Sequence, residues 1–207
     1  MGQHVPLGPP GLSVEVGDHV CALYRGSDGR DDVLLPYLEA GLQAGDRCIA
    51  VLDEADPDEV AARLSDSCDA DGARGSRQLD IRSSADTYLR GGGFSKPQML
   101  EFWDQAVGTG MAEGGFSFTR SVGEMTWALR DMPGVEGLVD YESDLNRFLP
   151  QYPQVIVCLY DLDRFDGSVV VDLLRTHPKL LLRGSLIDNP YYLEPEEFLR
   201  SRAASPA

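Results

Sequence analysis

The chain has 207 residues, of which 43% are hydrophobic and 25% are charged, so it is long enough to bury one full core. Its 18 Lys and Arg residues stand against 34 Asp and Glu residues, which gives a formal net charge of −16. A surface this acidic repels nucleic acid and anionic lipid, and the sequence has no basic run and no apolar run of membrane-spanning length. We therefore expect a cytoplasmic protein with no direct nucleic-acid or membrane partner.

The two ends of the chain differ in composition from the middle. Residues 1–17 contain the run Pro-Leu-Gly-Pro-Pro-Gly and predict a flexible N-terminal segment, and residues 201–207 predict a flexible tail. One domain is expected between them, over residues 18–200. Its four cysteines are widely spaced, and three of them fall within predicted strands, so a disulfide framework is not expected.

Strand and helix patterns alternate along this domain. Apolar runs predict strands at residues 19–24, 47–52, 78–82, 116–122, 155–160 and 178–183. Helical spacing and capping residues predict helices over residues 34–42, from Asp56 onward, after Lys96, and over 135–149 and 170–177. Because strands that alternate with helices need right-handed crossovers, we predict an α/β three-layer sandwich with a mostly parallel central sheet.

The most informative stretch is residues 155–161, Val-Ile-Val-Cys-Leu-Tyr-Asp. Six apolar or aromatic residues before an acid are typical of a strand covered on both faces, as in a parallel sheet. An acid that ends such a strand lies at the carboxyl edge of the sheet, where open α/β folds bind their ligands. We therefore expect a site at this edge.

A second strand, residues 19–24, is followed by a Gly/Ser/Asp loop and a helix, which is the layout of a phosphate-binding loop. The loop, Tyr24-Arg-Gly-Ser-Asp-Gly-Arg-Asp31, has no Gly-Lys-[Ser/Thr] step to wrap a triphosphate and hold magnesium. Its acids would also repel phosphate. We predict a chain with the shape of an NTPase and without a functional phosphate-binding loop.

Five residues at or just beyond the ends of central strands are candidates for a ligand pocket: Tyr24, Glu124, Trp127, Asp161 and Arg164. Glu124 and Trp127 would offer a small molecule one charged contact and one flat apolar wall. The alternative is a Trp that plugs the end of the core and a solvated Glu. Asp161 could equally cap the next helix or pair with Arg164. The sequence has no nucleophile elbow, Ser-His-Asp layout or paired-carboxylate motif, so we do not expect an enzyme.

Arg120 and Glu142 are charges on apolar faces of their predicted elements. Arg120 falls on the apolar side of its strand, and Glu142 falls on the apolar stripe of the following helix. A buried charge is costly unless it is paired, so we predict a structural ion pair between them. The alternative is that Arg120 faces a bound carboxylate or oxyanion.

Two histidines and two cysteines, namely His19, Cys21, Cys158 and His177, lie on or beside central strands. In principle they could form a tetrahedral zinc site, but their spacing contains no CxxC or HxxxH pair. We therefore expect core thiols and hydrogen-bonded histidines, with no metal and no cofactor.

Several phrases of the sequence resemble the methanogen/methylotroph DcmR sensory domain, or MEDS domain. They lie in family order at residues 19–24, 36–46, 87–90, 93–94, 123–127, 140–142, 157–165 and 176–178. This family looks like a degenerate relative of the RecA/KaiC ATPases, and residues 41–46 resemble the stretch that follows the phosphate loop in those proteins. The resemblance implies a RecA/KaiC-like fold that lacks a functional phosphate-binding loop.

The resemblance also implies a non-catalytic, signal-sensing function in bacterial or archaeal regulation, with a small, hydrocarbon-derived molecule as ligand. Because only residues 186–207 follow the domain, we expect the signal to pass to a separate protein, such as a kinase, an anti-sigma factor system or a transcription regulator. A homodimer is left open. The alternatives are a protein-interaction module without a ligand and a divergent nucleotide-binding protein.

Overall fold

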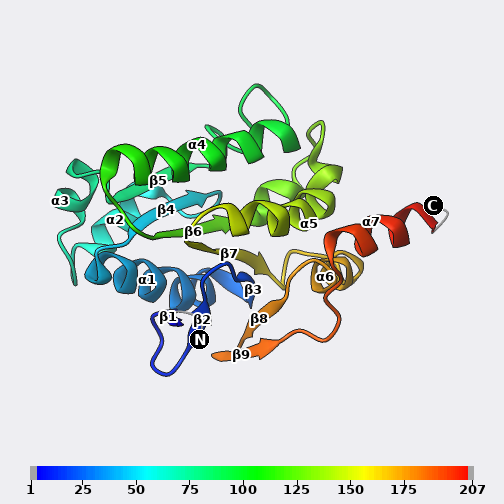
Figure 1. The fold of residues 1–207 in the computed structure, drawn as a ribbon, viewed down its shortest axis with the longest axis horizontal. Coiled ribbons are helices and arrows are strands. Elements are labelled where there is room, and N and C mark those ends of the chain that lie inside the picture. The colour runs from blue at the N-terminus through cyan, green and yellow to red at the C-terminus, as the bar shows by residue number, and fades with distance from the viewer. Residues whose placement is uncertain (1–3, 205–207) are drawn as a thin grey trace.

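The computed structural model describes residues 4–204, and a seven-stranded sheet lies at its centre (Figure 1). The strand order is β5-β4-β6-β7-β3-β8-β9. Neighbouring strands pair in parallel except β9, which runs antiparallel to β8. The strands are β3 (His19–Tyr24), β4 (Arg47–Leu52), β5 (Leu79–Ser83), β6 (Thr119–Glu124), β7 (Gln154–Asp161), β8 (Lys179–Leu182) and β9 (Ser185–Asp188).

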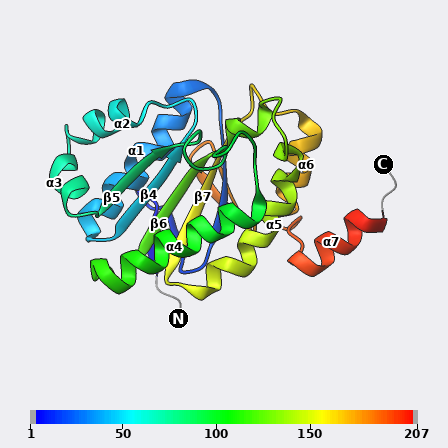
Figure 2. The ribbon, with the colours of Figure 1, turned by 90° about the horizontal axis from the view of Figure 1, so that it is seen from above.

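Helices cover both faces of this sheet, as the two views in Figures 1 and 2 show. One face carries α1 (Gly26–Ala44) and α2 (Pro57–Leu64), and the other carries α4 (Lys96–Gly114) and α5 (Leu138–Phe148). The remaining helices are α3 (Ala70–Gly75), α6 (Gly167–Leu174) and α7 (Pro195–Ala204), with 3-10 turns η1 (Met125–Leu129), η2 (Val135–Gly137) and η3 (Leu149–Gln151). The predicted α/β three-layer sandwich is therefore confirmed.

Each face of the sheet has its own apolar core, and β7 contributes to both. All residues of this strand are buried. Val157 packs in the core that includes α1, whereas its neighbours Cys158 and Tyr160 pack in the core that includes α4 and α5. The apolar run at residues 155–160 is thus a strand covered on both faces, as the sequence predicts.

Two helix boundaries follow from local chemistry that the sequence displays. The Asp56 side chain accepts hydrogen bonds from the backbone N–H groups of Asp58 and Glu59, so it caps the start of α2. Gly45 ends α1 with a φ of 79°, a left-handed conformation that glycine adopts without steric cost.

The N-terminal segment departs from the flexible lead-in expected for residues 1–17. Strands β1 (His4–Pro6) and β2 (Ser13–Glu15) form an antiparallel hairpin. Val5, Leu7 and Val14 are buried against the core on the α1 face. At the other end, α7 continues through Ala204, and residues 1–3 and 205–207 of the two expected flexible segments lie outside the described residues.

Candidate functional site

The ends of three central strands meet at the carboxyl edge of the sheet. Tyr24, the last residue of β3, pairs in register with Asp161, the last residue of β7. Glu124 ends β6 beside Leu159 of β7. The parallel register therefore brings three of the five predicted ligand residues to one edge, although they are far apart in the sequence.

Glu124 is fully buried at this edge and holds a loop in place. Its Oε2 accepts hydrogen bonds from the backbone N–H groups of Asp53, Glu54 and Ala55, at 2.8, 2.9 and 3.0 Å. The guanidinium of Arg30 lies 3.4 Å from its Oε1. The carboxylate that we expected either to contact a ligand or to be solvated is instead occupied by the loop between β4 and α2 and by Arg30 of α1.

Asp161 occupies the start of α1 in a similar way. Its Oδ1 accepts hydrogen bonds from the backbone N–H of Asp163 at 2.9 Å and from that of Gly26 at 3.4 Å. Gly26 opens α1, so a carboxylate of the protein lies where a phosphate-binding loop would present its amides. The expected alternative of an Asp161–Arg164 pair does not form, because the half-exposed Arg164 side chain forms an ion pair with Glu54.

Trp127 lies in the core and not in a pocket. It is fully buried, stacks on Tyr88 and packs against Phe94. The reason is local, since the chain turns into η1 directly after Glu124 and directs the indole toward the core formed with α4 and α5. Of the two arrangements that the sequence allowed for Trp127, the core plug is the one observed.

An apolar cavity of about 600 Å³ opens beside Tyr24, between the carboxyl ends of β3 and β8 and the first turns of α1. Burial, followed by the negative charges of Glu124 and Asp161, raises the pKa of the Tyr24 phenol, so the hydroxyl stays protonated. The cavity is lined by Pro9, Leu23, Tyr24, Arg25, Gly29, Asp32, Val33, Leu162, Leu181, Leu182, Arg183 and Gly184. We call it the Tyr24 cavity.

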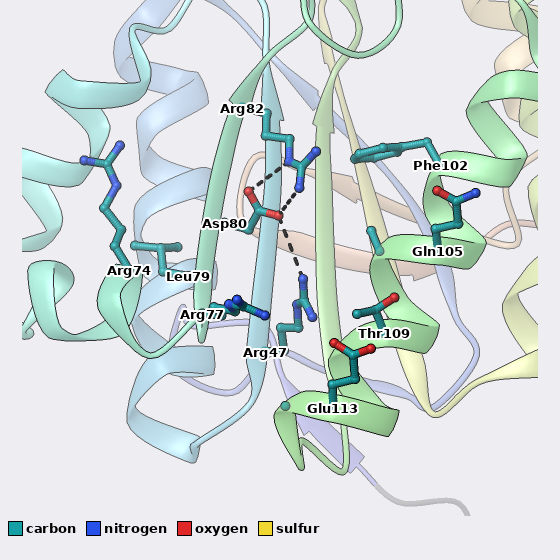
Figure 3. A pocket seen from close by; sticks show the side chains of 12 residues that line it. Arg47, Arg74, Arg77, Leu79, Asp80, Arg82, Phe102, Gln105, Thr109 and Glu113 are labelled. Carbon is teal, nitrogen blue, oxygen red and sulfur yellow. Dashed lines mark hydrogen bonds and ion pairs between the residues drawn. The ribbon is translucent and has the colours of Figure 1, made fainter.

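A second cavity, of about 480 Å³, lies between the edge strand β5 and α4 and is lined by four arginines, Arg47, Arg74, Arg77 and Arg82 (Figure 3). Arg82 donates two hydrogen bonds to Asp80, and Arg47 Nη2 lies 3.8 Å from the same carboxylate. Arg47 is only 8% exposed, and its Nε has no hydrogen-bond partner. Gly110 of α4 makes room for it, because a Cβ at that position would overlap the guanidinium. We call this hollow the arginine cavity.

The predicted ion pair between Arg120 and Glu142 is wrong, because the two residues lie on opposite faces of the sheet. Arg120 points toward α1, where it donates a hydrogen bond to Asp46 Oδ2 at 2.7 Å and another to the carbonyl of Pro6. Its guanidinium also lies 5.6 Å from the centre of the Tyr37 ring on α1. Glu142 belongs to α5, which covers the other face.

Glu142 instead meets three of the four His and Cys candidates in a buried group that we call the His–Glu cluster. Its members are His19, Glu142, Cys158 and His177, whose side-chain N, O and S atoms lie within 4.8 Å of one another. Both histidine Nε2 atoms lie 3.2 Å from Glu142 Oε2, and His19 Nε2 lies 3.3 Å from Cys158 Sγ. Cys21 pairs in register with Cys158 but stands outside this group.

Burial sets the protonation of the His–Glu cluster. Burial, followed by the neighbouring His177, lowers the pKa of His19 to about 4, so its imidazole is neutral at neutral pH. Burial would raise the pKa of Glu142, but the imidazoles of His177 and His19 outweigh it and lower the pKa. Burial also raises the pKa of the Cys158 thiol. An ionised carboxylate therefore lies deep in the protein beside a neutral ring and a neutral thiol.

Comparison with known proteins identifies the family. A sequence model of MEDS, described as the MEthanogen/methylotroph, DcmR Sensory domain, matches residues 18–178. The chain belongs to the MEDS family. The resemblance seen in the sequence motifs is thus confirmed over most of the chain.

Two known proteins are similar to this MEDS domain, one in sequence and one in fold. It is 27% identical to "Transcriptional repressor DcmR" of Methylorubrum extorquens (strain DSM 6343 / CIP 106787 / DM4) over 180 residues, which cover 81% of this chain and 60% of the repressor. Its fold is similar to the crystal structure of the KaiC-like protein PH0186 of Pyrococcus horikoshii OT3, with a TM-score of 0.64 and 13% identity. That match covers 87% of this chain and 80% of the other. The RecA/KaiC-like fold is therefore confirmed, and the family is that of a sensory domain of regulators.

Over residues 4–204, the helices are too short or too polar to cross a bilayer.

The sequence did not reveal two walls of the Tyr24 cavity, Leu181 and Leu182. A run such as residues 179–182 predicts a strand without indicating that one of its faces is uncovered. The sequence also did not reveal the partners of Glu142, since they come from three separate elements.

Proposed function

We propose that this MEDS domain is a non-catalytic sensory domain that binds a small, largely apolar molecule in the Tyr24 cavity and signals to a partner protein. The observation that carries the proposal is the cavity itself. Its volume of about 600 Å³ falls within the usual range for small-molecule sites, roughly 300–1,000 Å³, and leucines and a valine form much of its lining. Such a lining suits a short-chain hydrocarbon derivative.

Few of the residues that line the cavity are polar. Tyr24 is one of them, and Arg25, Asp32 and Arg183 are the charged residues of the lining. A ligand with an apolar body and one polar group, such as an alcohol, would satisfy this arrangement. A strongly charged ligand would lose hydration without gaining enough partners.

The absence of catalysis is supported by the way the carboxyl edge is filled. Glu124 accepts hydrogen bonds from three backbone amides after β4, and Asp161 accepts one from the amide at the start of α1. In a nucleotide-binding relative these positions would face phosphate and magnesium. Because protein carboxylates occupy both positions, the carboxyl edge of the sheet suits a structural role and not phosphoryl transfer.

The route of the signal is proposed to be the hairpin of β8 and β9. Leu181 and Leu182 of β8 line the cavity, and β9 is an edge strand with Ile187 47% exposed. Beyond it, Tyr191 is 67% exposed. An edge strand with exposed apolar side chains is a site where another protein can dock, so a ligand that moves β8 would alter the docking surface. The partner is proposed to be a transcription regulator, a kinase or an anti-sigma factor system.

Ligand binding can be tested by thermal shift with short-chain alkanes, alcohols and their derivatives. A ligand at about a hundred times its Kd stabilises the folded state by about 2.7 kcal/mol. Val33→Phe on α1 would fill the cavity and should abolish the shift. Val171→Phe on α6, where the valine is 58% exposed, is the matched control and should leave the shift unchanged. If no compound gives a shift, or if Val33→Phe leaves it intact, the proposed site is wrong and the domain is better explained as an interaction module.

A second candidate function is binding of an anionic ligand in the arginine cavity. It is favoured by Arg47, a buried guanidinium with an unpartnered Nε in a protein whose net charge is −16. Titration of the domain with citrate and phosphate, compared between wild type and Arg74→Gln, would test it. Saturable binding that weakens in the variant supports the candidate, and binding that is equal in both contradicts it.

A further inference from the structure

The His–Glu cluster draws its four side chains from four different parts of the fold. His19 begins β3, Cys158 lies within β7, Glu142 lies on α5, and His177 lies in the connection between α6 and β8. All four side chains are buried, and those of His19, Glu142 and His177 are fully so. Such convergence of ligand-type side chains in a core is costly unless something satisfies their polar atoms.

The outer hydrogen bonds of the two histidines fix which nitrogen carries a proton. His177 Nδ1 lies 2.9 Å from the carbonyl of Leu173, which can only accept, so Nδ1 is the protonated nitrogen. His19 Nδ1 lies 3.3 Å from Asn146 Oδ1, and the amide of Asn146 donates to the carbonyl of Thr176, so this Nδ1 is protonated too. When each ring is neutral, both Nε2 lone pairs therefore point into the cluster.

The centre of the cluster consequently has more acceptors than donors, because the Cys158 thiol, 3.3 Å from His19 Nε2, can donate to only one of them. Glu142 Oε1 receives a hydrogen bond of 2.8 Å from the Tyr160 hydroxyl, but Glu142 Oε2 and His177 Nε2 have no hydrogen-bond partner. Across residues 4–204, no Lys or Arg forms an ion pair with Glu142. Two imidazole lone pairs and a carboxylate oxygen at 3.2 Å repel one another unless a shared proton or a metal cation lies between them.

We propose that the His–Glu cluster is a metal site that binds one Zn²⁺ through His19 Nε2, His177 Nε2, Cys158 Sγ and Glu142 Oε2. In a tetrahedral zinc site, two N or O ligands are about 3.3 Å apart, and an N and an S ligand are about 3.5 Å apart. The observed separations of 3.2, 3.2 and 3.3 Å correspond to three edges of such a tetrahedron. The cluster is therefore preorganised for zinc.

Ligand chemistry and charge favour zinc in particular. Two imidazoles, a sulfur and a carboxylate suit Zn²⁺ better than Mg²⁺ or Ca²⁺, which prefer oxygen. Binding would release the Cys158 proton to solvent, and Zn²⁺ with one thiolate and one carboxylate makes a neutral group. A neutral group is far less costly to bury than the carboxylate alone. Asn146, the Leu173 carbonyl and Tyr160 already provide the outer hydrogen bonds that orient zinc ligands.

This metal site is separate from the Tyr24 cavity and would bind zinc whether or not the cavity binds a ligand. Four protein ligands leave no open coordination position, which is typical of a structural zinc site and not of a catalytic one. The metal would tie β3, β7, α5 and the chain before β8 together. Since β8 forms one wall of the Tyr24 cavity, zinc would also fix that wall.

The first test uses the wild-type chain, refolded from denaturant with Zn²⁺, with Co²⁺ or with a chelator. We expect about one zinc per chain by elemental mass spectrometry after removal of free metal. The zinc form should melt about 5–10 °C above the chelated form. The cobalt form should show a thiolate-to-cobalt charge-transfer band and the intense visible bands of tetrahedral Co²⁺.

The second test compares cluster variants with matched controls on the other cysteines and histidines. Cys158→Ser should remove the charge-transfer band, and His177→Gln should lower zinc content at least tenfold. The controls should keep both the charge-transfer band and the zinc content. They are Cys48→Ser, on the opposite face of the sheet, and His4→Gln, on β1. Zinc content near zero in the refolded wild type, with equal melting temperatures with and without zinc, would overturn the proposal and leave a proton-sharing cluster. Zinc that is lost in His4→Gln but kept in Cys158→Ser would overturn it as well.

Discussion

The indole of Trp127 stacks on the ring of Tyr88, with the ring centroids 4.6 Å apart and the planes inclined by 14°. Because Trp127 is fully buried, Trp127→Ala should lower the free energy of unfolding by about 3–5 kcal/mol in urea denaturation. Tyr191→Ala, at a 67% exposed position, should change it by less than about 0.5 kcal/mol. A small loss for Trp127→Ala would show that the indole lines a pocket after all.

Glu124 should be more important for stability than the other acids at the carboxyl edge. In Glu124→Gln a neutral amide replaces the carboxylate that accepts three backbone N–H groups, so we expect a loss of about 1–3 kcal/mol. Glu54→Gln, which removes only an exposed ion pair with Arg164, should cost about 0–1 kcal/mol. Urea denaturation of both variants checks this order, and equal losses would contradict the role given to Glu124.

Arg120 should be energetically coupled to Asp46 and not to Glu142. Arg120→Met should cost about 3–5 kcal/mol, because it leaves the Asp46 carboxylate and the Pro6 carbonyl without their donor. In a double-mutant cycle with Asp46→Asn, the coupling energy should exceed about 0.5 kcal/mol. The same cycle with Glu142→Gln should be additive within about 0.5 kcal/mol, since the two side chains lie on opposite faces. Coupling to Glu142 alone would restore the ion pair that the sequence suggested.

The loop from Tyr24 to Asp31 should not bind nucleotide. It offers no lysine, and Asp161 already accepts the amide of Gly26 at the start of α1. Equilibrium dialysis with labelled ATP and Mg²⁺ should therefore show no saturable binding at micromolar protein. Magnesium-dependent binding with micromolar affinity would contradict this assignment of the loop.

The four cysteines should differ sharply in reactivity. Burial raises the pKa of the Cys48 thiol to about 12, and Cys21 and Cys158 are buried as well, whereas Cys68 is partly exposed. Brief treatment of the native protein with iodoacetamide at mildly alkaline pH should therefore label Cys68 alone, as read by peptide mass spectrometry. Cys68→Ser should leave the native chain unlabelled, and rapid labelling of Cys48 would contradict its burial.

Much of the fold follows from patterns that are local in the sequence. The apolar run of β7, the Asp56 cap and the terminating Gly45 depend only on neighbouring residues, so they could be predicted. The hairpin at residues 4–15 could not, because its prolines and glycines are typical of a flexible segment. What holds it is distant, namely the buried Val5 and the bond from Arg120 to Pro6.

The candidate site was less predictable because it depends on which face of the sheet each residue meets. Strand alternation places Arg120 on one face of the sheet but does not say which helix covers that face. The sequence therefore could not decide whether Arg120 and Glu142 lie on the same face or on opposite faces. The zinc-type ligands likewise have no motif spacing, since His19 and His177 are brought together only by the pairing of β3 with β8. The Tyr24 cavity is a space left between side chains at the carboxyl edge of the sheet, and no sequence pattern predicts such a space.

The glycine that admits Arg47 has a consequence for how α4 opens. Gly110 and Gly108 lie within this helix, and each glycine in a helix interior costs about 1 kcal/mol relative to alanine. The carboxyl-terminal half of α4 should therefore exchange its amide hydrogens faster than the half around Trp103, whose indole is anchored by a hydrogen bond to Tyr141. Each such opening would bare the guanidinium of Arg47, so an anion that binds there would slow the exchange of this half-helix.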